Sequence, residues 1–438
     1  MYMVQVLVFL LLFAVAVFLF ARQARQIRRN ILLGRDANLT DHPGQRWRNV
    51  LLLALGQKKM FRKPLVAVLH LFVYTGFILI NLEILEIVLD GLLGKHRLFV
   101  PLLGRLYPWL IGAFEVLAVL VIVGCAAFLL RRNVKKIPRL RSHDLDGWPR
   151  SDANTILITE IVLMTLFLTM NTADQVLQTR GLEHYAATGN FLVSGNFTAI
   201  FEGLSTGLLV AIERSAWWLH IIGVLAFLNY LPYSKHLHII LAFPNAYYAD
   251  LNPKGTMENM PSVQHEVQLM MDPSLAAAAP AGDATPPKFG AKDVFDLTWK
   301  NLLDAYSCTE CGRCSAACPA NITGKKLSPR KIMMDTRDRL VAVGKNIHQH
   351  GSFQDDGKSL LRDYISEEAL RACTTCNACV QECPVSINPL HIISQLRRHL
   401  VMEESSAPAE WNGMFSNIEN NMAPWKFSPD DRDAWIHG

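Results

Sequence analysis

The chain has 438 residues, a net charge of +5 at pH 7, 51% hydrophobic residues and 18% charged residues. Soluble globular proteins average about 25% charged residues, so this composition excludes both a disordered chain and a wholly soluble one. Eight of the nine cysteines fall in two tight groups of four. Spacings this short indicate metal ligation rather than the disulfide framework of a secreted protein.

Five apolar stretches are long enough to cross ~30 Å of hydrocarbon, which takes about 20 helical residues. They lie at about 2–21, 64–89, 108–130, 154–172 and 207–234. Arginines, and no small-residue cleavage site, follow the first stretch, so we interpret it as a retained helix rather than a signal peptide. Residues 1–243 are therefore predicted to form a five-helix transmembrane bundle.

The basic residues between these stretches predict the orientation of the chain. Loops 22–63 and 131–153 carry eleven and seven Lys or Arg residues, whereas loops 90–107 and 173–206 carry three and one. Basic loops stay in the cytoplasm, so the N-terminus is expected outside and everything after the fifth helix inside. This places the cysteines in the cytosol, where thiols stay reduced, and the protein in the cytoplasmic (inner) membrane.

Histidines in two of the predicted helices are candidate haem ligands, because intramembrane histidines are rare and usually functional. His70 lies near the inner end of the second helix, and His238 lies on the cytoplasmic extension of the fifth, on the same side. Two imidazoles on facing helices suit a b-type haem. His220 lies 18 residues before His238, which is five helical turns and so the same face, whereas His236 is expected on another face. Helix packing is the alternative role for each histidine.

This arrangement resembles the cytochrome b subunit (gamma) of respiratory nitrate reductase, through LHLFVYTG in the second helix and WLHIIGVLAFLNYLPYSKHLHII in the fifth. That family has four haem-ligating histidines, two on each of these helices. The resemblance implies a haem b between His70 and His238. The second ligand of the second helix would fall near Ile80, so His220 lacks an evident partner. It stays a candidate for a second haem or for a quinone site.

Five acidic residues in or near the helices are candidates for a quinone site, which needs a proton-transferring group: Glu83, Glu86, Glu115, Glu160 and Glu213. The alternative for each is a structural role at a helix end or inside the bundle. Residues 244–295 then form an interfacial segment and a linker rich in Ala and Pro, which predicts a semi-extended connection.

The cysteines of residues 296–402 form two copies of one motif, CTECGRCSAACP and CTTCNACVQECP. Both read C-x2-C-x2-C-x3-C-P, in which the fourth cysteine ligates the other cluster of a two-cluster ferredoxin. We therefore expect one [4Fe–4S] cluster on Cys308, Cys311, Cys314 and Cys383, and another on Cys373, Cys376, Cys379 and Cys318. Zinc is the rival interpretation, but structural zinc sites favour separated Cys pairs or Cys with His.

The 54 residues between the motifs contain two predicted helices. This long insert, with the helix INPLHIISQLRRHLV after the second motif, resembles the iron–sulfur domains of the heterodisulfide reductase C-type and the succinate dehydrogenase type. The whole chain resembles membrane-bound, heterodisulfide reductase-like (Fe–S)-binding oxidoreductases, in which a cytochrome b domain is fused to a ferredoxin domain. The resemblance implies a cysteine-rich CCG module, which is absent from this sequence, so a separate cytosolic subunit is expected to supply it.

Residues 403–438 contain Trp411, Phe415, Trp425, Phe427 and Trp435 without helical periodicity. We interpret this segment as a partner-docking tail that does not form a free helix, with a disordered tail as the alternative.

The sequence contains no nucleotide-binding or nucleophile motif, so a substrate site is expected on a partner and no nucleic acid is expected to bind. The preferred function is a mainly α, membrane-anchored respiratory subunit of a quinone-linked oxidoreductase. It would relay electrons between a cytosolic partner, either a CCG-type subunit or an electron-transfer flavoprotein, and the quinone pool. The alternative is a membrane redox sensor or docking scaffold without turnover.

Overall fold

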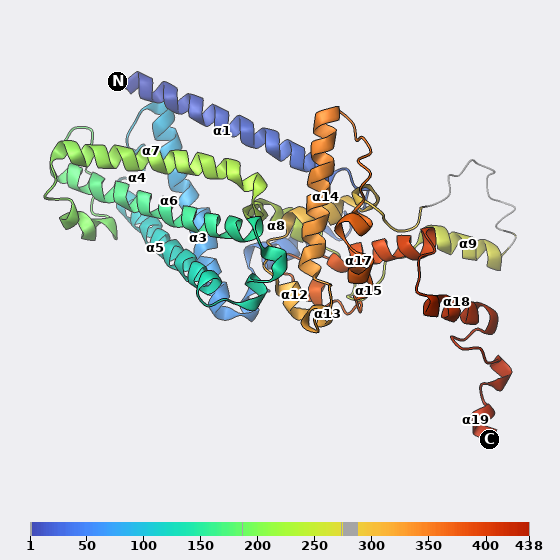
Figure 1. Cartoon of the computed structure of the whole chain (residues 1–438). Coiled ribbons are helices and arrows are strands. Elements are labelled where there is room, and N and C mark those ends of the chain that lie inside the picture. Colours follow the sequence, from blue (N-terminus) through green and yellow to red (C-terminus); the bar gives the residue numbers. More distant parts are fainter. Residues whose placement is uncertain (1, 186, 273, 275–287, 438) are drawn as a thin grey trace.

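The computed structural model describes residues 2–185, 187–272, 274 and 288–437 (Figure 1). In these ranges, five helices are long and apolar enough to span a membrane. They belong to α1 (Tyr2–Ile31), α3 (Pro64–Leu93), α5 (Tyr107–Asn133), α6 (Trp148–Thr179) and α7 (Thr206–Tyr230). The chain is thus a membrane protein, and the predicted fold class is confirmed: a mainly α chain with five apolar helices followed by a helical region.

Most of these helices extend beyond the predicted apolar stretches, because their polar ends also favour helix. α1 continues to Ile31 through a segment that contains neither Gly nor Pro. α3 begins with Pro64, whose missing N–H costs nothing in the first turn, and it is followed by Gly94 in the left-handed conformation. The Ser205 side chain accepts a hydrogen bond from the Leu208 amide and caps α7.

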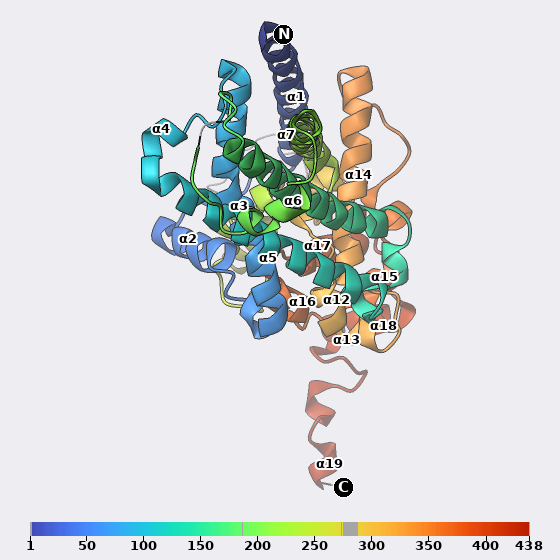
Figure 2. The same cartoon turned by 90° about the vertical axis from the view of Figure 1, so that its left-hand side faces the viewer.

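The four helices α3, α5, α6 and α7 form a bundle, and α1 lies along α3 and α7 (Figures 1 and 2). Their shared core contains Phe9 of α1, Ile111 of α5, Phe167 of α6 and Ile221 of α7. Shorter helices connect the elements: α2 (Pro43–Asn49), a π-helical turn (Val50–Leu55), α4 (Val100–Leu103) and a 3₁₀ turn (Ser194–Ile200).

The 18-residue spacing had predicted that the fifth membrane helix continues to His238, but the helix ends before it. α7 ends at Tyr230, two 3₁₀ turns follow (Leu231–Tyr233 and Lys235–Leu237), and α8 (His238–Tyr247) begins at His238. Pro232 cannot donate a helical hydrogen bond, and Ser234 adopts an extended conformation. The prediction that His220 and His238 share one face of one helix is therefore wrong.

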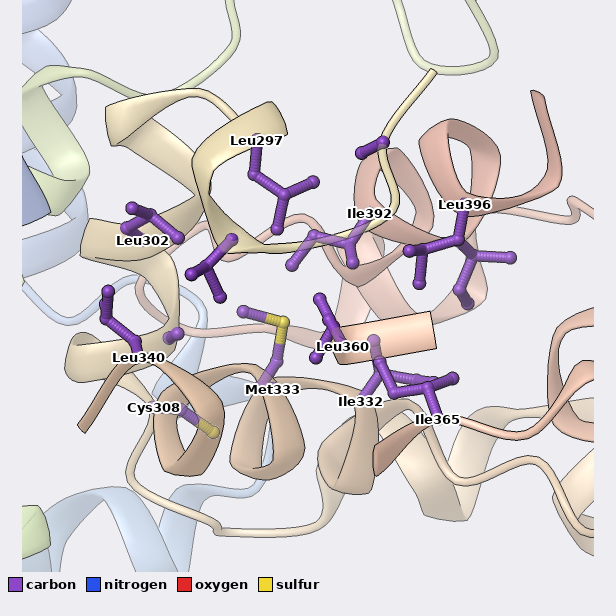
Figure 3. Close-up of a cluster of buried hydrophobic side chains, with 14 of the residues drawn as sticks. Leu297, Leu302, Cys308, Ile332, Met333, Leu340, Leu360, Ile365, Ile392 and Leu396 are labelled. Atoms are coloured by element: carbon purple, nitrogen blue, oxygen red, sulfur yellow. The ribbon is translucent and has the colours of Figure 1, made fainter. Parts of the chain in front are cut away.

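Seven α-helices lie between residues 296 and 402, and five of them contribute side chains to a separate apolar core (Figure 3). The seven are α11 (Trp299–Ser307), α12 (Arg313–Ala317), α13 (Pro319–Ile322), α14 (Pro329–His350), α15 (Glu367–Arg371), α16 (Ala378–Glu382) and α17 (Pro389–Arg398). Ile27 and Ile31 of α1 belong to the same core. The Arg29 side chain also donates to the Gly344 carbonyl of α14, 2.7 Å away. The end of α1 therefore joins the two halves of the molecule.

The predicted linker and tail contain more helix than expected. α9 (Pro261–Met271) lies before residues 275–287 of the Ala- and Pro-rich stretch, which are outside the described residues. The tail forms α18 (Ala409–Asn421) and α19 (Ala434–His437), which extend away from the rest of the chain (Figure 1). α18 was not predicted, but it contains no proline and carries Glu410 in its first turn, where an acid favours a helix.

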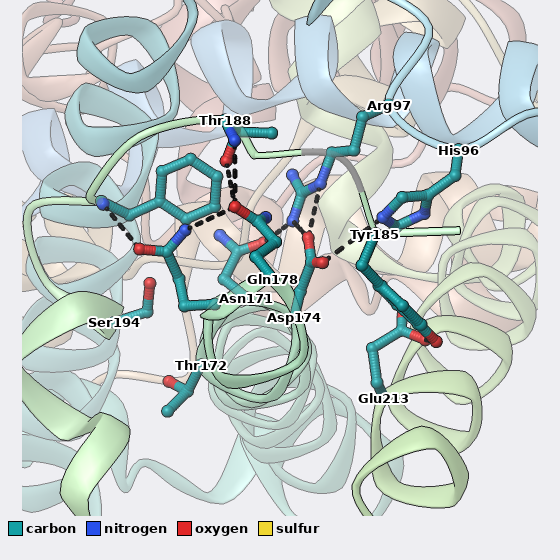
Figure 4. Close-up of polar contacts among 12 residues, drawn as sticks. His96, Arg97, Asn171, Thr172, Asp174, Gln178, Tyr185, Thr188, Ser194 and Glu213 are labelled. Atoms are coloured by element: carbon teal, nitrogen blue, oxygen red, sulfur yellow. Dashed lines mark hydrogen bonds and ion pairs between the residues drawn. The ribbon is translucent and has the colours of Figure 1, made fainter. Parts of the chain in front are cut away.

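Hydrogen bonds and ion pairs among polar side chains connect the helices and loops at the end of the bundle that lies far from the cysteines (Figure 4). Arg97 is buried and donates to Asp174 at 2.7–2.9 Å and to Asn171 at 2.7 Å. Asn171 in turn donates to Glu115, which accepts from the backbone of Ser194. Because buried polar groups are costly unless paired, this network fixes the loops that connect the helices.

Candidate functional site

The two cysteine motifs fold into matching backbone shapes. Glu310 and Thr375, each two residues after a first cysteine, have φ of 54° and 55°. Gly312 and Asn377, each four residues after it, are left-handed as well, with φ of 70° and 60°. The short helices α12 and α16 follow these positions and pack against each other. The sequence repeat is therefore also a structural repeat.

The structure brings the cysteines together around two cavities. A large cavity of about 350 Å³ is lined by Cys308, Cys311, Cys314 and Cys383, and Cys379 also reaches it. A narrower one of about 20 Å³ is lined by Cys318, Cys373, Cys376 and Cys379. In each group, three cysteines come from one motif and the fourth comes from the other. We call the first four the inner cluster site and the second four the outer cluster site.

The thiols of the inner cluster site suit an iron–sulfur cluster better than free cysteines. Burial raises the pKa of Cys308 to about 12 and that of Cys383 to about 11. Alone, both would stay protonated at neutral pH. Iron replaces the proton of a coordinating thiol. A bound cluster would therefore stabilise the thiolate form, which burial alone disfavours. Backbone amides also approach the sulfur atoms, with Ile387 N 3.3 Å from Cys383 Sγ and Thr375 N 3.4 Å from Cys373 Sγ.

Basic side chains hold the peptide carbonyls of three cysteines. Lys59, from the loop before α3, donates to the Cys383 carbonyl at 2.9 Å, and Arg139, from the loop after α5, donates to the Cys311 carbonyl. Both belong to the membrane half of the chain. At the outer cluster site, Arg397 of α17 donates to the Cys373 carbonyl at 2.6 Å. Sequence reasoning counted Lys59 and Arg139 only as markers of orientation.

The two histidines predicted to bind haem line the same large cavity as the inner cluster site. Nδ1 of His70 lies 3.0 Å from Gln57 Oε1, and Nδ1 of His238 lies 3.0 Å from the Lys235 carbonyl oxygen. Since both oxygens accept hydrogen bonds, each Nδ1 carries the proton and each Nε2 keeps its lone pair. This is the usual arrangement of metal-ligating histidines. Burial lowers the pKa of His238, which also favours the neutral, ligating form.

His236 lines this cavity too, although the sequence had suggested that it points elsewhere. Its ring centroid lies 5.6 Å from that of His238. The break between α7 and α8 places it there, and Pro232 in LPYS was the sequence signal for that break. Six cations also line the cavity and would suit the carboxylates of a porphyrin: Arg131, Arg132, Arg139, Lys235, Arg313 and Arg330.

His220 lies apart from the other histidines, beside a small cavity of about 60 Å³. Its Nδ1 donates to the Leu163 carbonyl at 2.9 Å, and its buried Nε2 has no hydrogen-bond partner among the described residues. Ile80 lines the same cavity, at the position where the resemblance had implied a second ligand. A space of this size holds a few water molecules, so it does not fit a second haem.

Three of the five candidate acids have structural partners. Glu86 accepts from Tyr107 Oη at 2.8 Å, Glu115 accepts from the Val193 amide at 2.8 Å, and Glu213 pairs with Arg214. Both carboxylate oxygens of Glu83 lack a hydrogen-bond partner within the described part of the chain. Glu160 lines both the large and the small cavity.

Comparison with known proteins identifies the cysteine-rich region. Residues 307–387 match the family model of a 4Fe-4S dicluster domain. The eight cysteines therefore serve two [4Fe–4S] clusters, and the zinc interpretation is set aside.

The chain is similar to curated proteins over nearly its whole length. It is 28% identical over 98% of its residues to a probable iron-sulfur-binding oxidoreductase, FadF, of Bacillus subtilis, and 26% identical over 98% to the EtfAB:quinone oxidoreductase of Syntrophomonas wolfei. It covers 60% and 58% of those two proteins. One of the subunits of the ferredoxin:CoB-CoM heterodisulfide reductase of Methanosarcina mazei is 31% identical over 24% of this chain and 52% of its own length. No solved structure matches the chain.

The chain is thus a membrane-anchored iron–sulfur protein related to these oxidoreductases, and it spans about 60% of the length of the first two relatives. The predicted resemblance to heterodisulfide reductase-like oxidoreductases is confirmed at this level.

Proposed function

We propose that this chain is the membrane subunit of a quinone-linked oxidoreductase, relaying electrons between an electron-transfer flavoprotein in the cytosol and the quinone pool. The observation that carries the proposal is the large cavity, because one continuous space is lined by the inner cluster site and by His70 and His238. The relative named EtfAB:quinone oxidoreductase supports the choice of partner and acceptor.

The ligand sets follow from the grouping of the cysteines. Cys308, Cys311 and Cys314 bind one [4Fe–4S] cluster together with Cys383, and Cys373, Cys376 and Cys379 bind the other together with Cys318. The crossed pairing is the usual one for C-x2-C-x2-C-x3-C-P motifs. It is supported by the matching cysteines around the two cavities, in which the single contribution of Cys379 to the large cavity marks the boundary between the sites.

We assign one haem b to His70 and His238, as the resemblance to the nitrate reductase gamma subunit implied. Their Nε2 atoms have no hydrogen-bond partner among the described residues, their Nδ1 atoms are fixed by hydrogen bonds, and both histidines line the large cavity. When bound, the clusters and the haem supply one-electron carriers. The chain itself holds the ligands in place and surrounds them with cations.

The remaining partners follow from the sequence. The basic loops place the cluster half in the cytoplasm, where it can meet soluble proteins, and the N-terminus outside. A CCG-type subunit would be a separate cytosolic chain, and the aromatic residues of the tail would bind it or the flavoprotein. Trp411, Phe415, Trp425, Phe427 and Trp435 are all at least 40% exposed, so they are available for this contact.

The haem assignment is tested by replacing each histidine with alanine in the full-length chain. His70→Ala and His238→Ala should each abolish the low-spin b-type absorbance of the purified protein, because a bis-histidine haem loses its ligation with either partner. His220→Ala is the matched control and should keep one haem per chain. The pyridine haemochrome assay measures the content. Two haems per wild-type chain, or loss of haem in His220→Ala alone, would contradict the assignment.

A further inference from the structure

One intramembrane acid lies at a cavity and has no hydrogen-bond partner among the described residues, although a histidine ring lies within ion-pair distance. Glu86, Glu115 and Glu213 each accept a hydrogen bond from a loop at the far end of the bundle. Glu160 is 6% exposed, lies in the middle of α6 and lines both cavities. The large and the small cavity therefore adjoin at its side chain.

Two other buried polar atoms without hydrogen-bond partners belong to residues that line the large cavity with Glu160. Nε2 of His236 lies 3.8 Å from Glu160 Oε1, within the range of an ion pair when the ring is protonated, and has no hydrogen-bond partner in the described parts of the chain. The hydroxyl of Tyr74, which lines the large cavity, is also buried without a partner there. Buried polar groups are nearly always hydrogen-bonded, so these atoms indicate a ligand with polar groups of its own.

Aromatic rings lie beside Glu160 and His236. The rings of Phe77 and Phe227 lie 6.0 Å and 5.3 Å from the His236 ring, centroid to centroid, and both phenylalanines line the small cavity with Glu160. The ring of His238, assigned to the haem, follows at 5.6 Å from His236. A flat ring with hydrogen-bonding oxygens would thus have apolar walls, polar partners and a redox centre beside it.

We infer that the space between Tyr74, Glu160 and His236 binds the head group of a quinone, with Glu160 as its proton donor. This inference rests on the proposed function. Reduction of a quinone to a quinol takes two electrons and two protons. The electrons come from the reduced carriers of this chain. Glu160 transfers its carboxyl proton to one quinone oxygen, is reprotonated from solvent and transfers the second proton to the other oxygen, while Tyr74 and His236 donate hydrogen bonds to these oxygens.

The experiment separates binding from proton transfer in the full-length protein. Glu160→Gln keeps size and hydrogen bonding but cannot release a proton. It should lower the rate at which decylubiquinone reoxidises the dithionite-reduced protein about a hundredfold, as expected when a general acid is lost. Binding of the fluorescent quinol analogue 2-heptyl-4-hydroxyquinoline N-oxide should change less than threefold. Glu160→Leu removes the polar contact as well and should weaken binding of this analogue about tenfold.

Glu83→Gln and Glu83→Leu are the matched controls, because Glu83 is a buried acid of the same bundle that lines neither cavity. Both should leave reduction and binding unchanged. Wild-type rates in Glu160→Gln, wild-type binding in Glu160→Leu, or equal losses in the Glu83 variants would overturn the inference. If Glu160→Leu fails to assemble haem and clusters, Tyr74→Phe replaces it in the binding test, and unchanged binding overturns the site.

The same measurements distinguish this inference from the proposed function. A wild-type protein with full haem and iron content that neither binds the analogue nor reduces decylubiquinone would overturn both. A wild-type protein that reduces the quinone, with Glu160→Gln equally active, would overturn only the site described here.

Discussion

The inner and the outer cluster site have the same motif and the same backbone conformation but different surroundings. The inner site faces the membrane half: Lys59 and Arg139 from two membrane-side loops hold its carbonyls, and its cavity continues to His70. The outer site lies away from that half, and its Cys376 is exposed. The same ligand spacing therefore occurs in two different environments, one in contact with the membrane domain and one near the solvent.

One position in the repeat shows how the surroundings act on the sequence. Gly312 of the first motif has a positive φ, and a Cβ there would meet the Arg139 carbonyl oxygen at 2.8 Å. Asn377 has the same left-handed conformation in the second motif but carries a side chain. Both residue types tolerate this conformation. The close approach of the membrane-side loop, not the turn itself, therefore demands glycine at the inner site.

The strongest test of the comparison exchanges single ligands. Cys318→Ser should remove the same EPR-active centre as Cys376→Ser, and Cys383→Ser should remove the same centre as Cys311→Ser, because each fourth cysteine serves the opposite motif. EPR of the reduced proteins, with iron content, distinguishes the centres. Loss of one common centre in Cys318→Ser and Cys311→Ser would show that each motif serves its own cluster.

A second test breaks the contact between the inner site and the membrane half. Arg330 is 1% exposed, and it pairs with Asp144 at 2.7 Å. Asp144→Ala leaves this buried cation without its carboxylate, although it keeps hydrogen bonds to Arg139 and Ser142, and removing one partner of a buried ion pair typically costs about 3–5 kcal/mol. The inner-site EPR signal should therefore disappear at a lower temperature than the outer-site signal during stepwise heating. Glu368→Ala is the control, since its pair with Lys326 is exposed and contributes about 0–1 kcal/mol. Equal losses in the two variants would contradict this role.

A third test concerns the partner expected near the outer site. The Arg371 guanidinium lies 5.4 Å from the Trp411 ring, so the tail begins beside the helix that precedes Cys373. Deleting residues 408–438 should leave haem and clusters intact but abolish co-purification of the cytosolic partner from native membranes. Buried aromatic anchors often contribute at least about 2 kcal/mol each at interfaces. Loss of the outer-site signal on deletion would instead show that the tail stabilises its own domain.

Much of this architecture was predictable from the sequence, because the signals were local. Hydrophobic length identified the five helices, and cysteine spacing identified the two clusters. His70 and His238 were singled out by their rarity in apolar segments. Their common cavity could not be predicted in the same way, since it depends on the break between α7 and α8. That break also brings His236 into the site.

The residues that sequence analysis missed make contacts with residues far from them in the sequence. Gln57 fixes His70, Lys59 reaches Cys383, and Arg139 reaches Cys311, across separations of 13, 324 and 172 positions. No periodicity or spacing records such contacts. Glu86 and Glu115 each accept a hydrogen bond from a backbone amide of a loop. The sequence could therefore not distinguish these structural acids from Glu160.

The smallest expected effect tests whether the membrane-side cations tune the inner site. A cation near a cluster stabilises its reduced form, which carries one more negative charge. Lys59→Gln should therefore make the midpoint potential of the inner cluster more negative by roughly 20–60 mV, the equivalent of one hydrogen bond for a one-electron couple. Arg397→Gln is the matched control, because Arg397 holds the Cys373 carbonyl, and it should shift only the outer cluster. Redox titration followed by EPR measures both. A shift of both clusters in either variant would mean that the charges act through the whole domain and that the two sites are not tuned separately.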